Sequence, residues 1–423
     1  MPSNCTSIIC VYPRLHIALC SADEARILHR SRLRNMDFFT LEDQPMSDKD
    51  GLFSPFSLVE IHRFASMLLL TLRSHQEHVV ICASRNNQRL LTNTGLMIGG
   101  FMILGKSVDL EDVNTSFSPI MPHFLPYHDP TSREGTSDIT ISDCWKALSL
   151  AKIQGWIVLN NSSHLLRIAE EDSQVAAADS FDPEECVHYA DPLNADLHIL
   201  IPGKLLVIAN PVDLPAGRQW MDAGTTRKFS PEFFADLLCD FNVVLVICLD
   251  ECQYDRSAFT ERGIGVEELR VRRESPNMLR AADRFLSLLA AAPGAVALHG
   301  GEACLHYTGP LVSAHMMLRL RFDAAAAASW LRIVCPRLVV PAGFLAELRS
   351  GAADVLHVAD PCAHILRCLS VPHLFPDPAQ AAADTAAADA ADAAAANPAP
   401  ASQAKAFSAP PLNKALSLPN VIL

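Results

Sequence analysis

The feature of this sequence that most restricts its fold is the segment of residues 295–321. It begins with an apolar run that ends at His299, continues through the small and polar residues GGEACLHYTG, and ends in the periodic segment PLVSAHMMLRLR. We expect a strand, a loop and an amphipathic helix that begins near Pro310, because proline suits the first helical turn, where its missing N–H needs no partner. A strand end, a glycine-containing loop and a helix N-terminus together can direct backbone N–H groups at a phosphate.

The composition is that of a largely globular chain without the charge that nucleic acids or anionic membranes attract. The chain has 423 residues, enough for two or three domains, of which 50% are hydrophobic and 19% charged. Its net charge of -13 argues against general nucleic-acid binding, which requires a basic surface, and against adhesion to anionic lipid. No apolar run reaches the roughly 18 residues that a spanning helix needs. We therefore expect no nucleic-acid partner and no membrane association.

The cysteines indicate a reducing compartment and no metal site. There are 13 of them, an odd number without regular spacing, which is typical of reduced thiols inside the cell. No Cys pair or Cys/His cluster has zinc-ligand spacing, because Cys248 and Cys252 lack a second pair. We therefore expect an intracellular protein, in the cytoplasm or nucleus, with no metal and no cofactor.

Apolar periodicity predicts an α/β fold. Helices are expected over residues 58–72, 95–104 and 139–154, and strands over residues 8–19, 79–82, 201–211 and 243–249. Ser230 and Pro231 predict a helix start, as the cap and the first helical residue. Cys82 is expected to be a small core residue. Helices that alternate with apolar strands favour a parallel-rich sheet covered on both faces.

Turns and composition divide the chain into four parts. We predict a first domain over residues 1–211, a connector over 212–228, a second domain over 229–373, and an Ala-rich, low-complexity tail over 374–423. The tail contains almost no large apolar residues, so it cannot bury enough surface to offset its ordering entropy. It is therefore expected to be disordered.

Several segments, in order, resemble the cell-division-cycle-fourteen family of dual-specificity phosphatases over residues 8–348. In the first half they are FSPFSLVEIHRF, LMIGGFMIL, FLPYHDP, DITISDCWKAL and DLHILIPGKLLVIANP. In the second half they are FSPEFFADLLCDFNVVLVICL, YDRSAFTERGIG, ADRFL, AVALH, TGPLVSAHMMLRLRF and SWLRIVCPR. The resemblance implies two tandem dual-specificity-phosphatase-like domains, the first non-catalytic, each with a mostly parallel central sheet flanked by helices. It also implies a groove between the domains, which in the family favours phosphoserine followed by proline.

The resemblance further implies a catalytic loop of sequence His, Cys, Lys, Ala, Gly, Leu, Gly, Arg, Thr, Gly, and this loop is degenerate here. With one residue inserted, the segment reads His299, Gly300, Gly301, Glu302, Ala303, Cys304, Leu305, His306, Tyr307, Thr308 and Gly309. The nucleophilic Cys is replaced by Gly300 or Gly301, depending on which end is aligned, and the phosphate-clamping Arg is replaced by Tyr307. Glu302 takes the position of the family's Lys and brings a negative charge to the site of a dianion.

The two remaining catalytic elements of the family are also altered. Arg272 or Arg273 stands in place of the general acid Asp, and an Arg side chain cannot donate a proton near neutral pH. The glutamine pair that positions water in the family is absent from VPAGF at residues 340–344. Cys304 is a thiol within the loop, but Pro310 rather than Arg stands six positions later, and packing as a small buried residue is the ordinary role of a free cysteine. His299 is expected to support the loop, as its counterpart does in the family.

These combined changes predict a pseudophosphatase that acts in binding or scaffolding within phosphorylation or cell-cycle signalling. Its expected partner is a protein, such as a phosphoprotein or a paralogous phosphatase. Two alternatives stay open: an active protein phosphatase that uses Cys304 as a displaced nucleophile, and a phosphopeptide-binding module.

Overall fold

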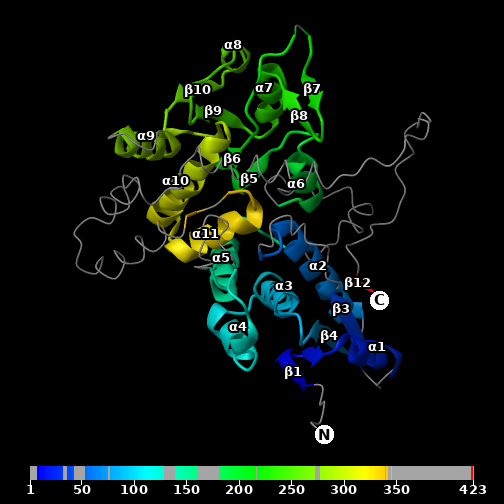
Figure 1. Cartoon of the computed structure of the whole chain (residues 1–423). Helices are drawn as coiled ribbons and strands as arrows, with labels where there is room; N and C mark the ends of the chain where they lie inside the picture. The colour runs from blue at the N-terminus through cyan, green and yellow to red at the C-terminus, as the bar shows by residue number, and fades with distance from the viewer. Residues whose placement is uncertain are drawn as a thin grey trace, which may run out of the picture.

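The computed structural model describes residues 7–31, 36–41, 53–74, 77–127, 139–159, 181–215, 217–271, 277–338, 340–341, 344 and 421–422. Two five-stranded sheets lie at opposite ends of the molecule, with a layer of helices between them (Figure 1). No helix in these ranges combines the length and the apolar character that crossing a bilayer requires.

The first sheet has the strand order β1-β2-β4-β3-β12 and is mixed. Its strands are β1 (Ser7–Tyr12), β2 (Leu15–Cys20), β3 (Met36–Leu41), β4 (His78–Ser84) and β12 (Val421–Ile422). The two central pairings of β4 are parallel, whereas β1–β2 and β3–β12 are antiparallel. A mostly parallel sheet was therefore the wrong prediction for this half. The single strand predicted over residues 8–19 is also wrong, because Pro13 and Arg14, the latter at φ 66°, turn the chain into a hairpin.

The helices of the first half are α1 (Ala22–Ser31), α2 (Leu58–Ser74), α3 (Gln88–Lys106), α4 (Leu110–Phe117), the 3-10 helix η1 (Met121–His123), α5 (Ile141–Ile153) and α6 (Pro183–Ala190). The structure confirms the predicted helices at α2 and α5. The helix expected over residues 95–104 starts earlier, because the Asn87 side chain accepts a hydrogen bond from the Leu90 N–H and caps α3 at Gln88. Cys82 is 2% exposed, which confirms it as a core residue.

The second sheet has the order β10-β9-β11-β6-β5, with three parallel pairings and one antiparallel pairing at β5–β6. Its strands are β5 (His198–Ile201), β6 (Leu205–Val207), β9 (Val243–Cys248), β10 (Gly265–Glu268) and β11 (Ala295–His299). A separate hairpin joins β7 (Trp220–Ala223) and β8 (Thr226–Phe229). The single strand predicted over residues 201–211 is wrong, since Gly203 at φ 67° lets the chain turn between β5 and β6. The domain division at residue 211 stays a prediction, but β5 and β6 hydrogen-bond within the second sheet.

The helices of the second half are α7 (Pro231–Asp240), α8 (Ser257–Thr260), α9 (Asn277–Ala291), α10 (Glu302–Leu320) and α11 (Ala324–Val334). The predicted start of α7 is confirmed: Ser230 accepts a hydrogen bond from the Phe233 N–H at 3.2 Å, and Pro231 is the first helical residue. Most of the predicted tail over residues 374–423 lies outside the described residues, apart from the two residues of β12.

One hydrophobic core passes through both halves of the molecule. It includes Trp145 and Trp156 from the first half and Trp330 from the second. Trp156 stacks on Phe322 with ring centroids 5.6 Å apart, and it lies 5.2 Å from Trp330. The indole N–H of Trp330 donates to the Leu200 carbonyl at 2.7 Å. This shared core holds the second sheet against the helices of the first half.

Candidate functional site

The segment that corresponds to the phosphatase loop is mostly helical. Helix α10 begins at Glu302, directly after its cap Gly301, and contains Pro310 within it. The prediction of a loop followed by a helix from Pro310 is therefore wrong. Ala, Leu and Glu are strong helix formers, and the inner glycines of the family loop are absent between Glu302 and Tyr307, so the inserted segment continues the helix instead of opening into a cradle.

The described residues of this segment separate into a buried part and an open part. Tyr307 and Thr308 are 3% and 2% exposed, and Tyr307 belongs to the hydrophobic core. Tyr307, predicted to replace the phosphate-clamping Arg, thus packs among core residues. At Gly301, by contrast, an added Cβ would meet no atom of the described residues within 4 Å. Gly309 lies within α10 and is buried.

Other predicted site residues lie outside what the structure describes. These are the side chains of Glu302, Ala303, Cys304, Leu305 and His306, and the whole of Arg272 and Arg273. Their predicted roles, including that of Cys304 as a displaced nucleophile, stay predictions. Gly300 lies between the end of β11 and the cap of α10, and it is half-buried.

His299 is held in place by hydrogen bonds at both ring nitrogens. It ends the five buried residues of β11 and is 2% exposed. Its Nδ1 lies 2.8 Å from the Asn210 side-chain oxygen, and its Nε2 lies 2.7 Å from the Tyr254 hydroxyl. Because the amide oxygen only accepts, Nδ1 carries the proton, and Nε2 of the neutral ring accepts from Tyr254. This arrangement selects one tautomer and fixes the plane of the ring.

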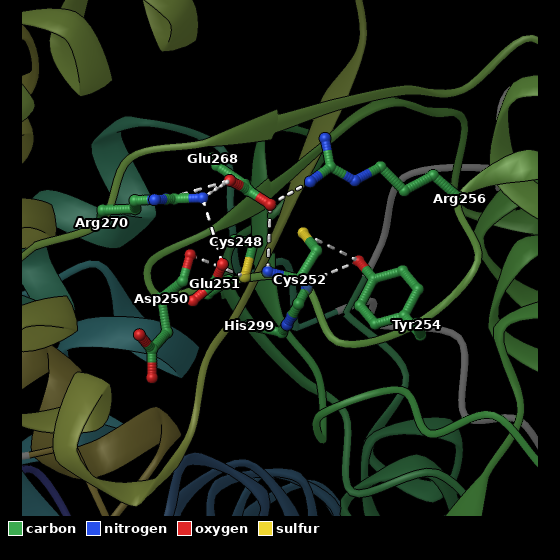
Figure 2. A network of polar contacts seen from close by, with 9 residues as sticks. All are labelled: Cys248, Asp250, Glu251, Cys252, Tyr254, Arg256, Glu268, Arg270 and His299. Carbon is green, nitrogen blue, oxygen red and sulfur yellow. Dashed lines mark hydrogen bonds and ion pairs between the residues drawn. The ribbon is translucent and has the colours of Figure 1, made fainter.

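Two cysteines lie beside this histidine at the carboxyl edge of the second sheet (Figure 2). Cys248 is the last residue of β9 and is 1% exposed, and Cys252 follows in the next loop. The Sγ atoms of Cys248 and Cys252 and a ring nitrogen of His299 all lie within 4.8 Å of one another. The carboxyl edge of parallel strands is where open α/β sheets place their ligand sites.

Hydrogen bonds within this group favour the thiolate of Cys252. Hydrogen bonding with Cys248 is the largest cause that lowers the pKa of Cys252 to about 5, although the partial burial of Cys252 opposes the shift. Burial, together with the charge of a Cys252 thiolate, raises the pKa of the Tyr254 hydroxyl well above its ordinary value. The Cys252 thiol therefore differs from an ordinary surface cysteine.

The loop that carries Cys252 is fixed by Glu268 at the end of β10 (Figure 2). The Glu268 carboxylate accepts a hydrogen bond from the Cys252 backbone N–H at 3.1 Å. The same carboxylate pairs with Arg256 and, at 3.1 Å, with Arg270. Two guanidinium groups neutralise the Glu268 carboxylate. The side chains that could supply negative charge to a bound ion are therefore those of Cys248 and Cys252.

Sequence reasoning did not find this group. It considered Cys248 and Cys252 only as half of a four-cysteine zinc site, and it did not connect them with His299 or Tyr254. One signal was present in the sequence: a cysteine ends a buried strand, and a second cysteine and a tyrosine follow in the next turn. The pairing of β9 with β11, which sets His299 opposite Cys248, appears only in the sheet register.

A cavity of about 500 Å³ lies elsewhere, between the two halves of the molecule. Leu58 and Arg63 of α2, Tyr189 of α6, and Trp330 of α11 contribute to its walls. None of the described residues of the 299–309 segment lines it. This cavity is therefore separate from the position of the phosphatase loop.

Comparison with known proteins relates the chain to one phosphatase group. The family model described as "Dual specificity protein phosphatase, N-terminal half" matches residues 14–151. Human dual specificity protein phosphatase CDC14C is 24% identical over 72% of this chain and 64% of its own length. Tyrosine-protein phosphatase CDC14 of Saccharomyces cerevisiae is also 24% identical, over 72% of this chain and 52% of its own.

Less than two thirds of the length of each of these relatives is matched. A solved structure of P. aeruginosa TpbA in complex with pTyr is 18% identical, with a TM-score of 0.23, over 36% of this chain and 98% of that one. The family model and the two CDC14 phosphatases together confirm the family resemblance. The chain therefore resembles the CDC14 dual-specificity protein phosphatases, as its sequence segments predict.

Proposed function

We propose that this protein is a pseudophosphatase, which retains the family fold, has lost phosphomonoester hydrolysis, and acts by binding another protein. The observation that carries the proposal is the conversion of the catalytic loop into the first turns of α10, with Tyr307 in the core at the position of the clamping Arg. A guanidinium can hold two phosphate oxygens, whereas a buried phenol in this position offers none of that charge. Loss of a nucleophile alone typically costs a factor of about 10⁶ in rate.

The proposed partner is a protein, either a phosphoprotein or a paralogous phosphatase, inside the cell. Support for this comes from the resemblance to the CDC14 phosphatases and from the net charge of -13, which disfavours nucleic acid. A role in phosphorylation or cell-cycle signalling is part of the same proposal, and it is supported by the similarity to proteins named CDC14 phosphatases.

Activity is tested with the full chain, purified under reducing conditions. p-Nitrophenyl phosphate and a phosphoserine-proline peptide are the substrates, and Cys304→Ser and Cys252→Ser are the matched variants. We expect no turnover above the background rate in any of the three proteins. Turnover that Cys304→Ser abolishes would falsify the proposal and establish the displaced-nucleophile alternative.

Phosphopeptide binding without hydrolysis is tested separately by calorimetry. The backbone N–H groups at the start of α10 could attract an anion, since Gly301 provides no capping side chain. Glu302 adds a negative charge at the same helix end, so we expect no difference in heat between the phosphorylated and unphosphorylated peptides. Binding of the phosphorylated peptide alone would favour the phosphopeptide-binding module.

A further inference from the structure

The triad of Cys248, Cys252 and His299 has the donor atoms of a zinc site. We infer that these three residues bind one Zn²⁺ ion, a role that does not depend on the proposed function. Their donor atoms lie within 4.8 Å of one another. In a tetrahedral site with Zn–S near 2.3 Å and Zn–N near 2.0 Å, neighbouring donors lie about 3.5–3.8 Å apart. A contraction of about 1 Å in loop and side-chain positions therefore closes the triad on the ion.

His299 already has the tautomer and the support that a metal-binding histidine needs. Its Nδ1–H donates to the Asn210 oxygen at 2.8 Å, so Nε2 is unprotonated and available as a ligand atom. A hydrogen bond from the distal nitrogen to an oxygen is the usual outer support of a metal-bound imidazole. The Tyr254 hydroxyl, which now donates to Nε2, would give up that contact to the ion.

The charge and softness of the donors select the class of ion. Two thiolates and one neutral imidazole neutralise a divalent ion, which suits a partly buried position. Sulfur and nitrogen donors favour Zn²⁺, whereas Ca²⁺ and Mg²⁺ require oxygen ligands. The nearby Glu268 carboxylate is occupied by Arg256 and Arg270 and so is not counted among the ligands.

The scaffold positions the triad on three separate segments. Cys248 ends β9, Cys252 lies in the loop that Glu268 fixes, and His299 ends β11. The parallel register pairs His299 with Cys248, so a buried sheet sets the separation of two of the ligands. Three protein ligands leave the fourth position for water or for the Tyr254 oxygen, which lies 3.8 Å from the Cys252 sulfur.

The test uses the full chain, reduced and stripped of metal with a chelator. Zn²⁺ affinity is measured by competition with a chromophoric chelator, and Co²⁺ is used as a spectroscopic probe of the ligands. We expect one ion per chain and a thiolate-to-Co²⁺ charge-transfer band. Cys252→Ser and Cys248→Ser should each weaken Zn²⁺ binding more than about 100-fold, and Asn210→Ala about 10- to 100-fold, as is typical of an outer-support residue.

Cys239→Ser is the matched control, because Cys239 is an exposed thiol on α7, outside the triad. Its Zn²⁺ affinity should equal that of the unmodified chain. Cys252 and Asn210 lie in loops and are not buried, so we expect their variants to fold. They therefore test Zn²⁺ binding even if Cys248→Ser does not fold. The inference is overturned if the chain binds no Zn²⁺ at micromolar concentration, if Cys252→Ser binds it equally well, or if the Co²⁺ spectrum contains no thiolate band.

Discussion

Gly301, one of the two residues predicted to replace the family's nucleophile, has room for a side chain among the residues that the structure describes. A Cβ added there would meet none of their atoms within 4 Å, and the backbone of Gly301 is extended, with φ -60° and ψ 171°. We therefore expect the described residues to tolerate a thiol at this position. The other parts of the catalytic machinery differ from the family at separate positions, above all at Tyr307.

We predict that Gly301→Cys folds but does not hydrolyse p-nitrophenyl phosphate. A thiol at this position has no guanidinium to hold the phosphate oxygens, because Tyr307 packs in the core in place of the Arg. The measurement is turnover by Gly301→Cys and Gly300→Cys, with circular dichroism as the check on folding and Gly301→Ser as the control. Turnover by Gly301→Cys alone would show that the lost thiol was the sole barrier to catalysis.

In helix α3, side-chain packing is expected to outweigh helix propensity at a glycine position. Gly99 lies within this buried helix, and an added Cβ would come within 2.2 Å of the Trp145 ring nitrogen. The Trp145 side chain of α5 is fully buried and packs against the rings of Phe117 and Phe124, so a shift of the indole would disturb these contacts.

Gly99→Ala is expected to destabilise the protein by about 1–3 kcal/mol through overpacking. Propensity alone predicts the opposite, since alanine stabilises a helix interior by about 1 kcal/mol relative to glycine. Urea unfolding measures the difference. Gly105→Ala is the control, because its Cβ would approach the Phe101 ring only to 3.2 Å. A Gly99→Ala variant more stable than the unmodified chain would contradict the packing argument.

Helix α10 contains a buried histidine that makes stability depend on pH. His315 is 6% exposed, and its burial, together with the charges of Lys204 and Arg319, lowers its pKa to about 4. Its Nδ1 has no hydrogen-bond partner among the described residues. The neutral ring is therefore the form that the folded state accommodates.

We predict that protonation linked to His315 lowers the free energy of unfolding as the pH falls from about 6.5 to about 4. In this window the unfolded chain binds the proton more readily than the folded chain, so acid favours unfolding. The loss should reach on the order of 3 kcal/mol below pH 4. Urea unfolding of His315→Leu at pH 7, 5.5 and 4.5 should show a smaller loss, and equal losses in the two proteins would exclude this histidine as the cause.

At the scale of the whole molecule, the two halves share one core. Trp156 stacks on Phe322 and packs against Trp330 across the junction, and Lys146 of α5 pairs with Asp323 beside α11. A core that is continuous across a junction opposes the separate unfolding of its two sides. We therefore expect the sheets to unfold in one transition, with far-UV circular dichroism and tryptophan fluorescence changing together.

Trp156→Ala tests this junction directly. It should lower the free energy of unfolding by about 3–5 kcal/mol, the usual cost of removing a buried aromatic ring. Trp220→Ala, at a residue 46% exposed on β7, should cost less, about 1 kcal/mol, since a partly exposed side chain loses less burial and its cation–π contact with Arg227 is worth about 0.5–1 kcal/mol. Two well-separated transitions in the unmodified chain would show that the halves fold independently.

The sequence was sufficient for features that depend on neighbours along the chain. The cap at Ser230, the apolar strand at β9, the helices α2 and α5 and the burial of Cys82 follow from local periodicity and from residue chemistry. The predicted loss of the nucleophile and of the clamping Arg also rests on residue identity alone and stays a prediction. The helix start predicted at Pro310 was wrong, because a proline that is typical of a first helical turn lies inside the longer helix α10.

Only the tertiary structure determined which distant residues meet. Cys248, Cys252 and His299 come together because β9 and β11 pair in a parallel register that no local pattern contains. In the same way, β5 and β6 join the second sheet although they precede the predicted domain boundary. Sheet register and the packing of one half on the other depend on residues far apart in the sequence, because they minimise the exposed apolar surface of the whole chain. They therefore cannot be predicted from the residues of a single segment.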